Sequence, residues 1–530
     1  MRIRLLPCLS ALALSLVGTA PAESQDAEGP SLVVMISIDQ LRGDLIDHFE
    51  EAFTGGFRRF LDEGFRFTSA SHAHAVTHTA PGHATLSTGV FPSRSGIVAN
   101  NWSQRVGGMW QSMYAVEDLD HPILDFENEE QLPGRSPKNL LRTGLADWVR
   151  AADDDSRTVS ISSKDRSAIT MAGQTDSNVY WLVSQLGRFV TSTFYDDSYD
   201  RWVERFNENE MPDIIGPPVW ENDTPERFRG LARADSASYE GRGVSTFPHE
   251  RSLEAGSDSR QAGKAWALGT SRADAAVMGL ARAAMENFDL GQRDNTDYLA
   301  ISLSATDYVG NGYGPFSQEQ LVNLRHVDRI LGEFFDYLDS EVGEGQWVVG
   351  LSADHGVVTM PEYEQERGNM SAERLSPAAE GPKVTAALEA ASAGGGSPEE
   401  IAERLARYLE REGIAEKAYT HMELTRGQPA DSFAVMYRNS HYPGRAHHAM
   451  SVYGVEFRYP EGDLVSFPTG TTHGTAYWYD RHVPLMFLGR GVSAGSSGVA
   501  AYTVDIAPTL AALAGIAAPS DLDGRAIIPR

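Results

Sequence analysis

Cysteine is nearly absent from this chain of 530 residues: Cys8 is the only one, and it lies close to the amino terminus. The rest of the protein therefore forms no disulfide and offers no thiolate ligand to a metal ion. Basic residues are also scarce, since 45 Lys and Arg stand against 73 Asp and Glu, which gives a formal net charge of -28. A surface of this charge repels nucleic acid and anionic lipid, so we expect neither nucleic acid nor membrane partners.

Long apolar runs are missing apart from one near the start of the chain. Residues 1–22 contain two arginines, the run Leu5 to Val17 and the pattern Ala20-Pro21-Ala22, which together are typical of a cleavable signal peptide. Cys8 lies inside the apolar run rather than after it, so a lipoprotein anchor is not expected. No other run approaches the ~20 residues that span a bilayer. We predict an exported protein, periplasmic or secreted.

Apolar, β-branched runs predict the centre of the fold. With 41% hydrophobic residues the chain can bury a large core. Continuous runs of this type form strands buried on both faces, and segments with helical spacing at 264–288 and 318–342 lie between or beside them. We therefore predict an α/β fold with a mostly parallel central sheet flanked by helices. The predicted strands are Ser31–Ile38, Tyr298–Leu303 and Trp347–Ser352, with Thr158–Ser162 as a shorter one.

Acidic residues follow each of the three longer strands, namely Asp39, Asp307 and Asp354. One acid at a strand end is usually a helix cap, but three at the same edge of a parallel sheet favour a metal site. The loop after the shorter strand carries Lys164 and Arg166, which reach the same edge if that strand is parallel. Taken alone, these two cations would be read as a solvated loop.

The stretch from Ala75 to Trp102 (AVTHTAPGHATLSTGVFPSRSGIVANNW) has Thr79 at its centre. Pro81 fits the first turn of a helix and Thr79 is a good capping residue, so the threonine hydroxyl should lie at a helix start. Helix starts attract anions through their N–H groups and the helix dipole. Thr79 is therefore either a plain helix cap or a nucleophile that receives a phosphoryl group in a positive field.

The sheet pattern is interrupted between residues 361 and 469. This segment begins polar and rich in Gly, Ala and Pro, and continues with a charged helix at 398–412. His447 and His448 follow in a turn, and because adjacent residues on a strand face opposite ways we do not expect them to bind one metal ion. We interpret the segment as an insertion that shapes access to the site. The strands expected on either side of this turn are Ser432–Arg438 and Ala449–Phe457.

A set of short motifs occurs in order along the chain: IDQLR, THTAPGHATLSTG, GIVANNW, SSKDRSAI, SATDYVG, SADHG, TTHGT, YDRHVPL and VDIAPTLAAL. This set resembles the alkaline phosphatase superfamily. Within it, the chain is most similar to the phosphate-irrepressible periplasmic phosphomonoesterases, which are related to nucleotide pyrophosphatase/phosphodiesterases. The resemblance implies a catalytic domain formed by residues 23–360 and 470–530, with 361–469 as an insertion or cap, and small phosphate esters as substrates.

The resemblance also implies a site with two Zn²⁺ ions and a threonine nucleophile. The implied residues are Asp39, Asp354 and His355 for zinc two, with Thr79 bridging to substrate; Asp307, His473 and residue 311 for zinc one; and Asn100, Lys164 and Arg166 for the phosphoryl oxygens.

The expected activity is that of an exported, zinc-dependent phosphate monoester hydrolase acting through a phosphothreonine intermediate. A monoester carries one more negative charge than a diester, so the two cations Lys164 and Arg166 favour monoesters. A phosphodiesterase or nucleotide pyrophosphatase is the alternative enzyme. A degenerate phosphatase that binds phosphate compounds without turnover is the alternative outside catalysis.

One position departs from the family pattern. Asn311 stands where the family has a histidine, four residues after Asp307. An amide oxygen is a weaker zinc ligand than an imidazole, so zinc one should bind less tightly, or another divalent metal should replace it. His482 is a candidate substitute ligand, and tolerance of Asn311 with a slight loss of affinity is the alternative. The sequence indicates neither the natural substrate nor the oligomeric state.

Overall fold

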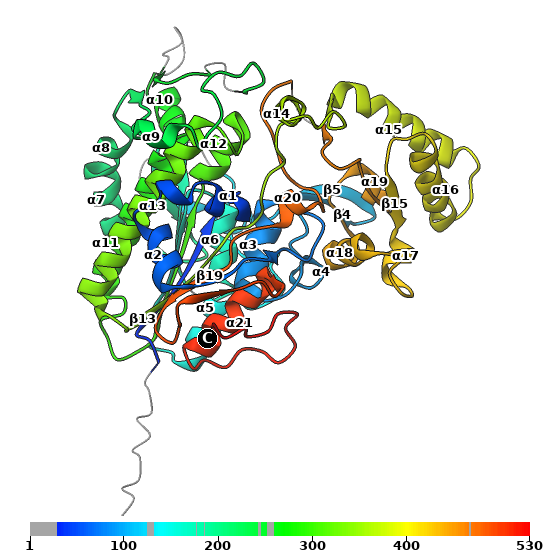
Figure 1. Ribbon diagram of the computed structural model, residues 1–530. Coiled ribbons are helices and arrows are strands. Elements are labelled where there is room, and N and C mark those ends of the chain that lie inside the picture. Colours follow the sequence, from blue (N-terminus) through cyan, green and yellow to red (C-terminus); the bar gives the residue numbers. More distant parts are fainter. Residues whose placement is uncertain are drawn as a thin grey trace, which may run out of the picture.

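The computed structural model describes residues 29–124, 132–175, 177–184, 186–241, 245–251, 259–465 and 468–529. The predicted signal peptide, residues 1–22, lies outside the described residues. Figure 1 shows a large α/β body and a smaller lobe beside it. Within the described ranges, no helix is both long enough and apolar enough to cross a membrane.

The body is built on a sheet of ten strands, and its centre is parallel, as predicted. β1 lies between β12 and β13 and is parallel to both, and β12 is in turn parallel to β7. Antiparallel strands occur on both sides of this centre, where β19 pairs with β13 and β9 pairs with β8. In order across the sheet the strands are β20 (Gly495–Ser497), β2 (Phe65–Phe67), β19 (Met486–Gly489), β13 (Trp347–Ser352), β1 (Leu32–Ile38), β12 (Asp297–Leu303), β7 (Thr158–Ser162), β8 (Asn178–Val183), β9 (Arg188–Ser192) and β6 (Ile123–Leu124).

Helices cover both faces of the sheet (Figure 1). Alternate residues of β1 enter different cores: Val34 and Ile36 belong to one apolar cluster, while Val33 and Met35 belong to the other. A strand with an apolar layer on each side cannot show polar alternation, which is why β1 reads as a continuous apolar run. One face is covered by α1 (Gly43–His48), α2 (Gly56–Glu63), α7 (Arg201–Asn209), α11 (Arg272–Phe288) and α13 (Gln318–Leu338), and the other by α3 (Thr79–Thr88), α5 (Leu145–Ala152), α6 (Asp165–Ala172) and α21 (Ile506–Leu513).

The helix expected over 264–288 is divided in two. α10 spans Ser259–Leu268, and α11 begins only at Arg272. Gly269 follows the end of α10, and glycine disfavours a continuous helix because it loses more backbone entropy than other residues. The Thr270 hydroxyl donates to the Ala267 carbonyl at 2.6 Å, which satisfies an acceptor that the broken helix leaves open.

The smaller lobe consists of residues from the 361–469 segment and has an apolar core of its own, centred on Leu405, Leu409 and Val455. The charged helix predicted at 398–412 is confirmed as α16, which starts with a capping box between Ser397 and Glu400. The lobe contains α14 (Pro361–Glu366), β14 (Arg374–Leu375), α15 (Pro377–Ser392), α16 (Pro398–Arg411), β15 (Lys417–Thr420), α17 (His421–Thr425), α18 (Ser432–Ser440), β16 (Arg445–Ala446), α19 (Ala449–Val452), β17 (Val455–Arg458) and β18 (Leu464–Val465).

Two expected strands of this lobe are wrong. Ser432–Arg438 lies in the helix α18, whose first turn is capped by the Asp431 side chain accepting from the Ala434 N–H. Ala449–Phe457 divides into the short helix α19 and the strand β17. In both places a side chain caps the helix start, which outweighs the apolar alternation that suggested a strand.

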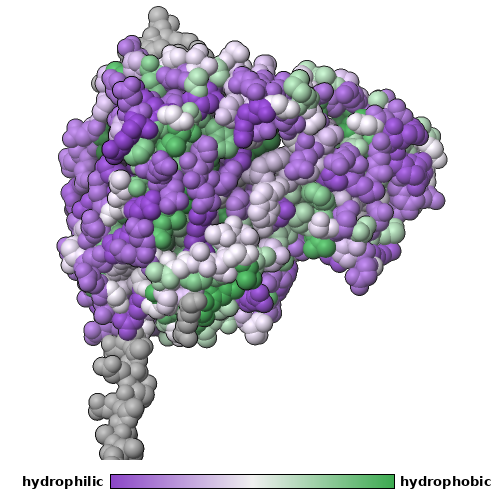
Figure 2. Space-filling view, viewed as in Figure 1, coloured by the Kyte–Doolittle hydropathy of each residue, from purple (hydrophilic) through white to green (hydrophobic). Residues whose placement is uncertain are grey.

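The visible face of the molecule is mostly hydrophilic, in keeping with its charge (Figure 2).

Candidate active site

Thr79 is the first residue of α3, so the predicted helix start is confirmed. The capping position itself is His78, and no side chain caps this helix. The Thr79 side chain is almost fully buried, and its hydroxyl accepts a hydrogen bond from the Arg166 guanidinium at 3.3 Å. The threonine therefore does not satisfy the helix start, and its oxygen is left facing a cation at the positive end of the helix dipole.

Asn100 lies beside the same helix start. Its side-chain oxygen accepts the backbone N–H of Ala80 at 2.8 Å. That bond orients the amide, because the oxygen is held and the NH₂ group must point the other way. Asn100 thus offers a donor next to Thr79, where a phosphoryl oxygen would bind.

Asp39, Asp354 and His355 converge at the carboxyl edge of the sheet, directly after β1 and β13. The His355 Nε2 atom lies 3.5 Å from Asp39 Oδ1 and 3.3 Å from Asp354 Oδ2. All three side chains are completely buried, and these three atoms make no hydrogen bond within the described residues. His355 Nδ1 lies 2.9 Å from the Gly356 carbonyl, which keeps the proton on Nδ1 and turns the Nε2 lone pair toward the acids.

This donor set fits a divalent cation. Tetrahedral zinc ligands at ~2.0 Å from the ion stand about 3.3 Å apart, close to the separations seen here. Buried carboxylates without a partner are costly unless a cation compensates them. Burial and repulsion from Asp354 raise the pKa of Asp39 well above its usual range, and burial lowers the pKa of His355 to about 4, so the imidazole is neutral and able to bind a metal.

A second cluster contains Asp307, His473 and the shared His355. Asp307 lies in the first turn of α12 (Ala305–Tyr313), just after β12. His473 Nδ1 is 2.7 Å from the Thr77 carbonyl, which leaves Nε2 toward Asp307 Oδ1 at 3.7 Å. The rings of His355 and His473 stack with centroids 3.5 Å apart, so the two clusters adjoin. Burial opposes ionisation of Asp307, but Lys164 lowers its pKa to about 2.

Asn311 reaches this second cluster, but it presents its nitrogen rather than its oxygen. Its NH₂ group donates to Asp307 Oδ1 at 2.9 Å, and its oxygen accepts from the Gln40 side chain at 2.8 Å. Gln40 also donates to Asp307 Oδ1, at 2.7 Å. The orientation is fixed by chemistry, since an ionised carboxylate only accepts hydrogen bonds.

Lys164 and Arg166 reach the same edge because β7 is parallel to β12, as anticipated. The Lys164 ammonium lies between the clusters, 2.5 Å from Asp39 Oδ2 and 2.7 Å from Asp307 Oδ2. Burial opposes its charge, yet these two acids raise the pKa of Lys164 above its usual range, so it remains an ammonium.

Three residues near the site were not predicted. Gln40 follows Asp39 directly and adopts the left-handed backbone region with φ of 67°, which places its side chain between Asp307 and Asn311. His83 lies one turn after Thr79, and its Nδ1 is 3.3 Å from Asp354 Oδ2.

The third unpredicted residue is Asp480, which holds the loop after His473 by accepting the N–H groups of Gly474 and Thr475. Adjacency to a predicted ligand could have pointed to Gln40, and helical spacing from Thr79 could have pointed to His83. No local signal marks Asp480, because its contacts are set by the fold of the loop.

His482 does not approach the second cluster in the way a substitute ligand would. Its Nδ1 lies 2.9 Å from the Ala70 carbonyl, and its ring stacks on Trp478. His482 belongs to none of the groups of metal-binding side chains found among the described residues.

The model of the type I phosphodiesterase / nucleotide pyrophosphatase family matches residues 33–469. This match extends over most of the chain, and the chain therefore belongs to that family. Several alkaline phosphatases align with this chain over almost their whole length. Alkaline phosphatase PhoV of Synechococcus elongatus is 31% identical over 99% of both chains. Alkaline phosphatase PhoK of a Sphingomonas species is 30% identical, covering 96% of this chain and 92% of PhoK.

The fold also matches crystal structures of alkaline phosphatase PafA. The TM-score is 0.84 at 26% identity, covering 94% of this chain and 98% of PafA. One of these structures is a PafA variant replaced at a threonine, an asparagine, a lysine and an arginine. The predicted alkaline phosphatase-like fold is thereby confirmed.

Gly82 controls how closely α3 approaches the metal-binding edge. A Cβ atom at this position would lie 2.2 Å from the Asp354 carbonyl oxygen, which is too close for any real contact. We predict that Gly82→Ala lowers the free energy of unfolding by at least about 1–3 kcal/mol, because the helix or the β13 end must move. Chemical denaturation measures this.

Gly381 supplies the matched control. It lies in the helix α15, and a Cβ atom there would meet nothing within 4 Å. Gly381→Ala should leave stability unchanged or raise it by up to about 1 kcal/mol. If Gly82→Ala and Gly381→Ala are equally stable, the close approach of Gly82 to the Asp354 carbonyl is contradicted.

Proposed function

We propose that this protein is an exported alkaline phosphatase, a zinc-dependent hydrolase of small phosphate monoesters that acts through a phosphothreonine intermediate. The observation that carries the proposal is the position of the Thr79 hydroxyl at the start of α3, beside Arg166 and next to two acid–histidine clusters. The names of the relatives PhoV, PhoK and PafA support the monoesterase reading.

The PafA variant adds support at the level of residues. The four residue types replaced in it occur in this chain in the same order, as Thr79, Asn100, Lys164 and Arg166. Here these side chains surround one helix start and the adjoining acids.

Each residue has a role that its contacts suit. Thr79 Oγ1 attacks phosphorus in line, the bond from phosphorus to the leaving oxygen breaks, and water then cleaves the phosphothreonine to release phosphate. The Asn100 NH₂ group and the Arg166 guanidinium donate to phosphoryl oxygens, and the α3 dipole favours their negative charge. Lys164, which lies between Asp39 and Asp307, would donate to a phosphoryl oxygen if cations bound those two carboxylates in its place.

The proposed zinc ligands are Asp39, Asp354 and His355 for one ion and Asp307 and His473 for the other, with Thr79 bridging and Asn311 adjacent. Zinc at these positions supplies Lewis-acid stabilisation of the entering and leaving oxygens. For Asn311 to present its oxygen, the amide would have to rotate and lose its hydrogen bonds to Asp307 and Gln40. The site of Asp307 and His473 (site one) should therefore bind zinc more weakly than the site of Asp39, Asp354 and His355 (site two), or take another divalent metal.

We further propose that residues 1–22 are a signal peptide, that 23–360 and 470–530 form the catalytic domain, and that 361–469 is a cap. A cavity of about 420 Å³ supports the role of the cap in substrate access. Its lining combines His78 and His473 of the body with His448 and Tyr459 of the cap. A leaving group of the substrate would occupy this space.

A phosphodiesterase is the second candidate, because the family model carries that activity in its description. The substrates of the two activities differ in charge, since a monoester carries one more negative charge on its phosphoryl group than a diester. Lys164 and Arg166 lie where that group would bind. A degenerate phosphatase is less well supported, since the nucleophile, the cations and the first metal cluster are all in place.

Replacement of Thr79 tests the nucleophile. Thr79→Val keeps the shape of the side chain but removes the hydroxyl, and we expect kcat for an aryl phosphate to fall at least about 10³-fold. Thr79→Ser should retain activity and form a covalent phosphoenzyme that acid quenching traps.

The matched control is Thr85→Val, in the same helix, where the buried hydroxyl makes no hydrogen bond within the described residues. This variant should hydrolyse the aryl phosphate at the wild-type rate. Full activity of Thr79→Val would overturn the proposed mechanism.

Replacement of the cations tests monoester preference. In Lys164→Ala/Arg166→Ala we expect kcat/KM for an aryl phosphate to fall at least about tenfold more than that for a bis-aryl phosphate, since the monoester carries the extra charge. Lys138→Ala, which removes an exposed lysine paired with Asp118, is the control. Faster diester than monoester cleavage by the wild type would favour the second candidate instead.

Replacement of Asn311 tests metal site one. Asn311→His restores an imidazole ligand, so zinc at this site should resist a chelator at about tenfold higher concentration than in the wild type. Metal content after graded chelation measures the difference. Asn311→Ala, which offers neither a ligand nor a hydrogen bond, should show no such gain; equal retention by all three proteins would refute a weak site one.

A further inference from the structure

Four histidines of the smaller lobe surround one buried glutamate, Glu456. They come from separate elements: His421 begins α17, His441 directly follows α18, and His447 and His448 lie between β16 and α19. Glu456 itself lies in β17, and its side chain is only 3% exposed. None of these five residues is among the proposed catalytic residues or zinc ligands, although His447 and His448 line the cavity assigned to the leaving group.

Histidine nitrogens approach the carboxylate oxygens closely within this cluster, and His421 donates a hydrogen bond to Glu456. His421 Nε2 is 2.9 Å from Glu456 Oε1, and His447 Nε2 is 3.5 Å from Glu456 Oε2. The rings of His421 and His441 lie with centroids 4.1 Å apart, and a nitrogen of each ring lies within 4.8 Å of the other and of the carboxylate. At the catalytic edge the corresponding nitrogen–oxygen separations are 3.3 to 3.7 Å.

His448 has a different part in the cluster. Its Nδ1 accepts the backbone N–H of Ser451 at 3.0 Å, so the proton of the neutral ring must be on Nε2. That nitrogen faces Glu456 Oε2 at 3.2 Å. His448 therefore turns a protonated nitrogen toward the carboxylate, and it has no free lone pair there with which to bind a metal ion.

The expectation that His447 and His448 face apart is wrong, because β16 ends at Ala446 and the chain bends before α19, so both rings turn toward Glu456. The bend depends on packing in the lobe rather than on the local sequence pattern.

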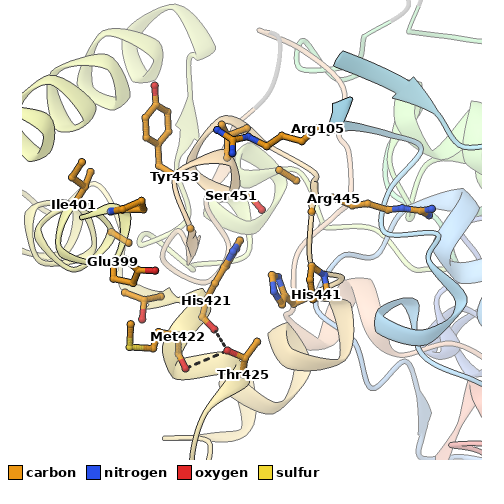
Figure 3. Close-up of a pocket in the computed structure, with 18 of the residues that line it drawn as sticks. Arg105, Glu399, Ile401, His421, Met422, Thr425, His441, Arg445, Ser451 and Tyr453 are labelled. Carbon is orange, nitrogen blue, oxygen red and sulfur yellow. Dashed lines mark hydrogen bonds between the residues drawn. The ribbon is translucent and has the colours of Figure 1, made fainter. Parts of the chain in front are cut away.

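The other pair, His421 and His441, adjoins open space. Both line a cavity of about 790 Å³, and Figure 3 shows them at its wall, from α17 and from the end of α18. The ring of His441 makes no hydrogen bond within the part of the chain that is described. A cation held by these two rings and Glu456 could complete its coordination with water from the cavity.

The charge of the cluster is uncompensated. Within the described ranges no Lys or Arg forms an ion pair with Glu456, whose ion-pair partners are all histidines. Glu456 Oε2 is also among the buried atoms that lack a well-formed hydrogen bond.

A purely structural polar network explains the cluster less well. Such a network satisfies a buried carboxylate with donors, as the Ser451 hydroxyl does for Glu456 Oε1 at 2.7 Å. It does not account for the His441 ring, which makes no hydrogen bond within the described residues and lies beside the hydrogen-bonded pair of His421 and Glu456. Two imidazoles, one carboxylate and an open position form a donor set that zinc prefers.

We propose that His421, His441 and Glu456 bind a divalent cation of the zinc type, separate from the catalytic clusters. The ion links α17, the end of α18 and β17, and so braces the lobe that borders the active-site cavity. The Ser451 hydroxyl positions the carboxylate by donating to Oε1, and His448 lies against Oε2.

Metal content of the whole protein tests this proposal. Wild type, His441→Ala and Glu456→Gln are loaded with Zn²⁺, freed of loose metal, and analysed by mass spectrometry. Each variant should hold about one equivalent less than the wild type. Anomalous diffraction at the zinc edge from wild-type crystals should place a peak between His421 and Glu456.

His326→Ala is the control, since His326 belongs to none of the metal-binding groups among the described residues. It should keep the wild-type zinc content. Glu456→Gln preserves side-chain shape, and circular dichroism shows that each variant is folded. Equal metal content in all four proteins, or no anomalous peak at the cluster, would overturn the proposal.

The readout is independent of the phosphatase proposal. If the wild type fails to hydrolyse aryl phosphate, but both variants still hold one zinc less than the wild type, only the proposed function is refuted.

Discussion

The register of three parallel strands is the constraint on which the rest of this structure depends. Ile38 of β1 pairs with Leu303 of β12, and Ser37 pairs with Ser352 of β13, so the strands end at the same level. The acids that follow each strand therefore lie together at one buried edge of the sheet, where their exposure to solvent is low. Mutual repulsion at that edge is relieved only by cations, and Lys164 already supplies one between Asp39 and Asp307.

The start of helix α3 lies close to this charged edge. Gly82 lets the helix pack against the Asp354 backbone, and His83, the next residue, lies 3.3 Å from the Asp354 carboxylate. The smaller lobe supports the loop before the helix, since the Ser440 hydroxyl accepts the Ala75 N–H and Asn439 donates to the Ala73 carbonyl.

The smaller lobe, like the main site, brings histidines together around a buried acid. Glu456 is buried, has no Lys or Arg ion-pair partner in the described structure and is faced by histidine side chains, whereas at the sheet edge Lys164 pairs with Asp39 and Asp307. A small apolar core around Leu405 and Leu409 gives limited stability by itself. Binding of a cation by side chains from several elements would add stability that such a core lacks.

The sequence by itself determined the central strands, the acids after them, the helix start at Thr79 and the cations Lys164 and Arg166. These features depend on local periodicity, capping and strand direction, which neighbouring residues encode. Only the tertiary structure decided that Gln40 and Asn311 pair on Asp307 and that four histidines meet at Glu456. Those contacts join residues far apart in the chain, and packing of the whole molecule selects them over local preference.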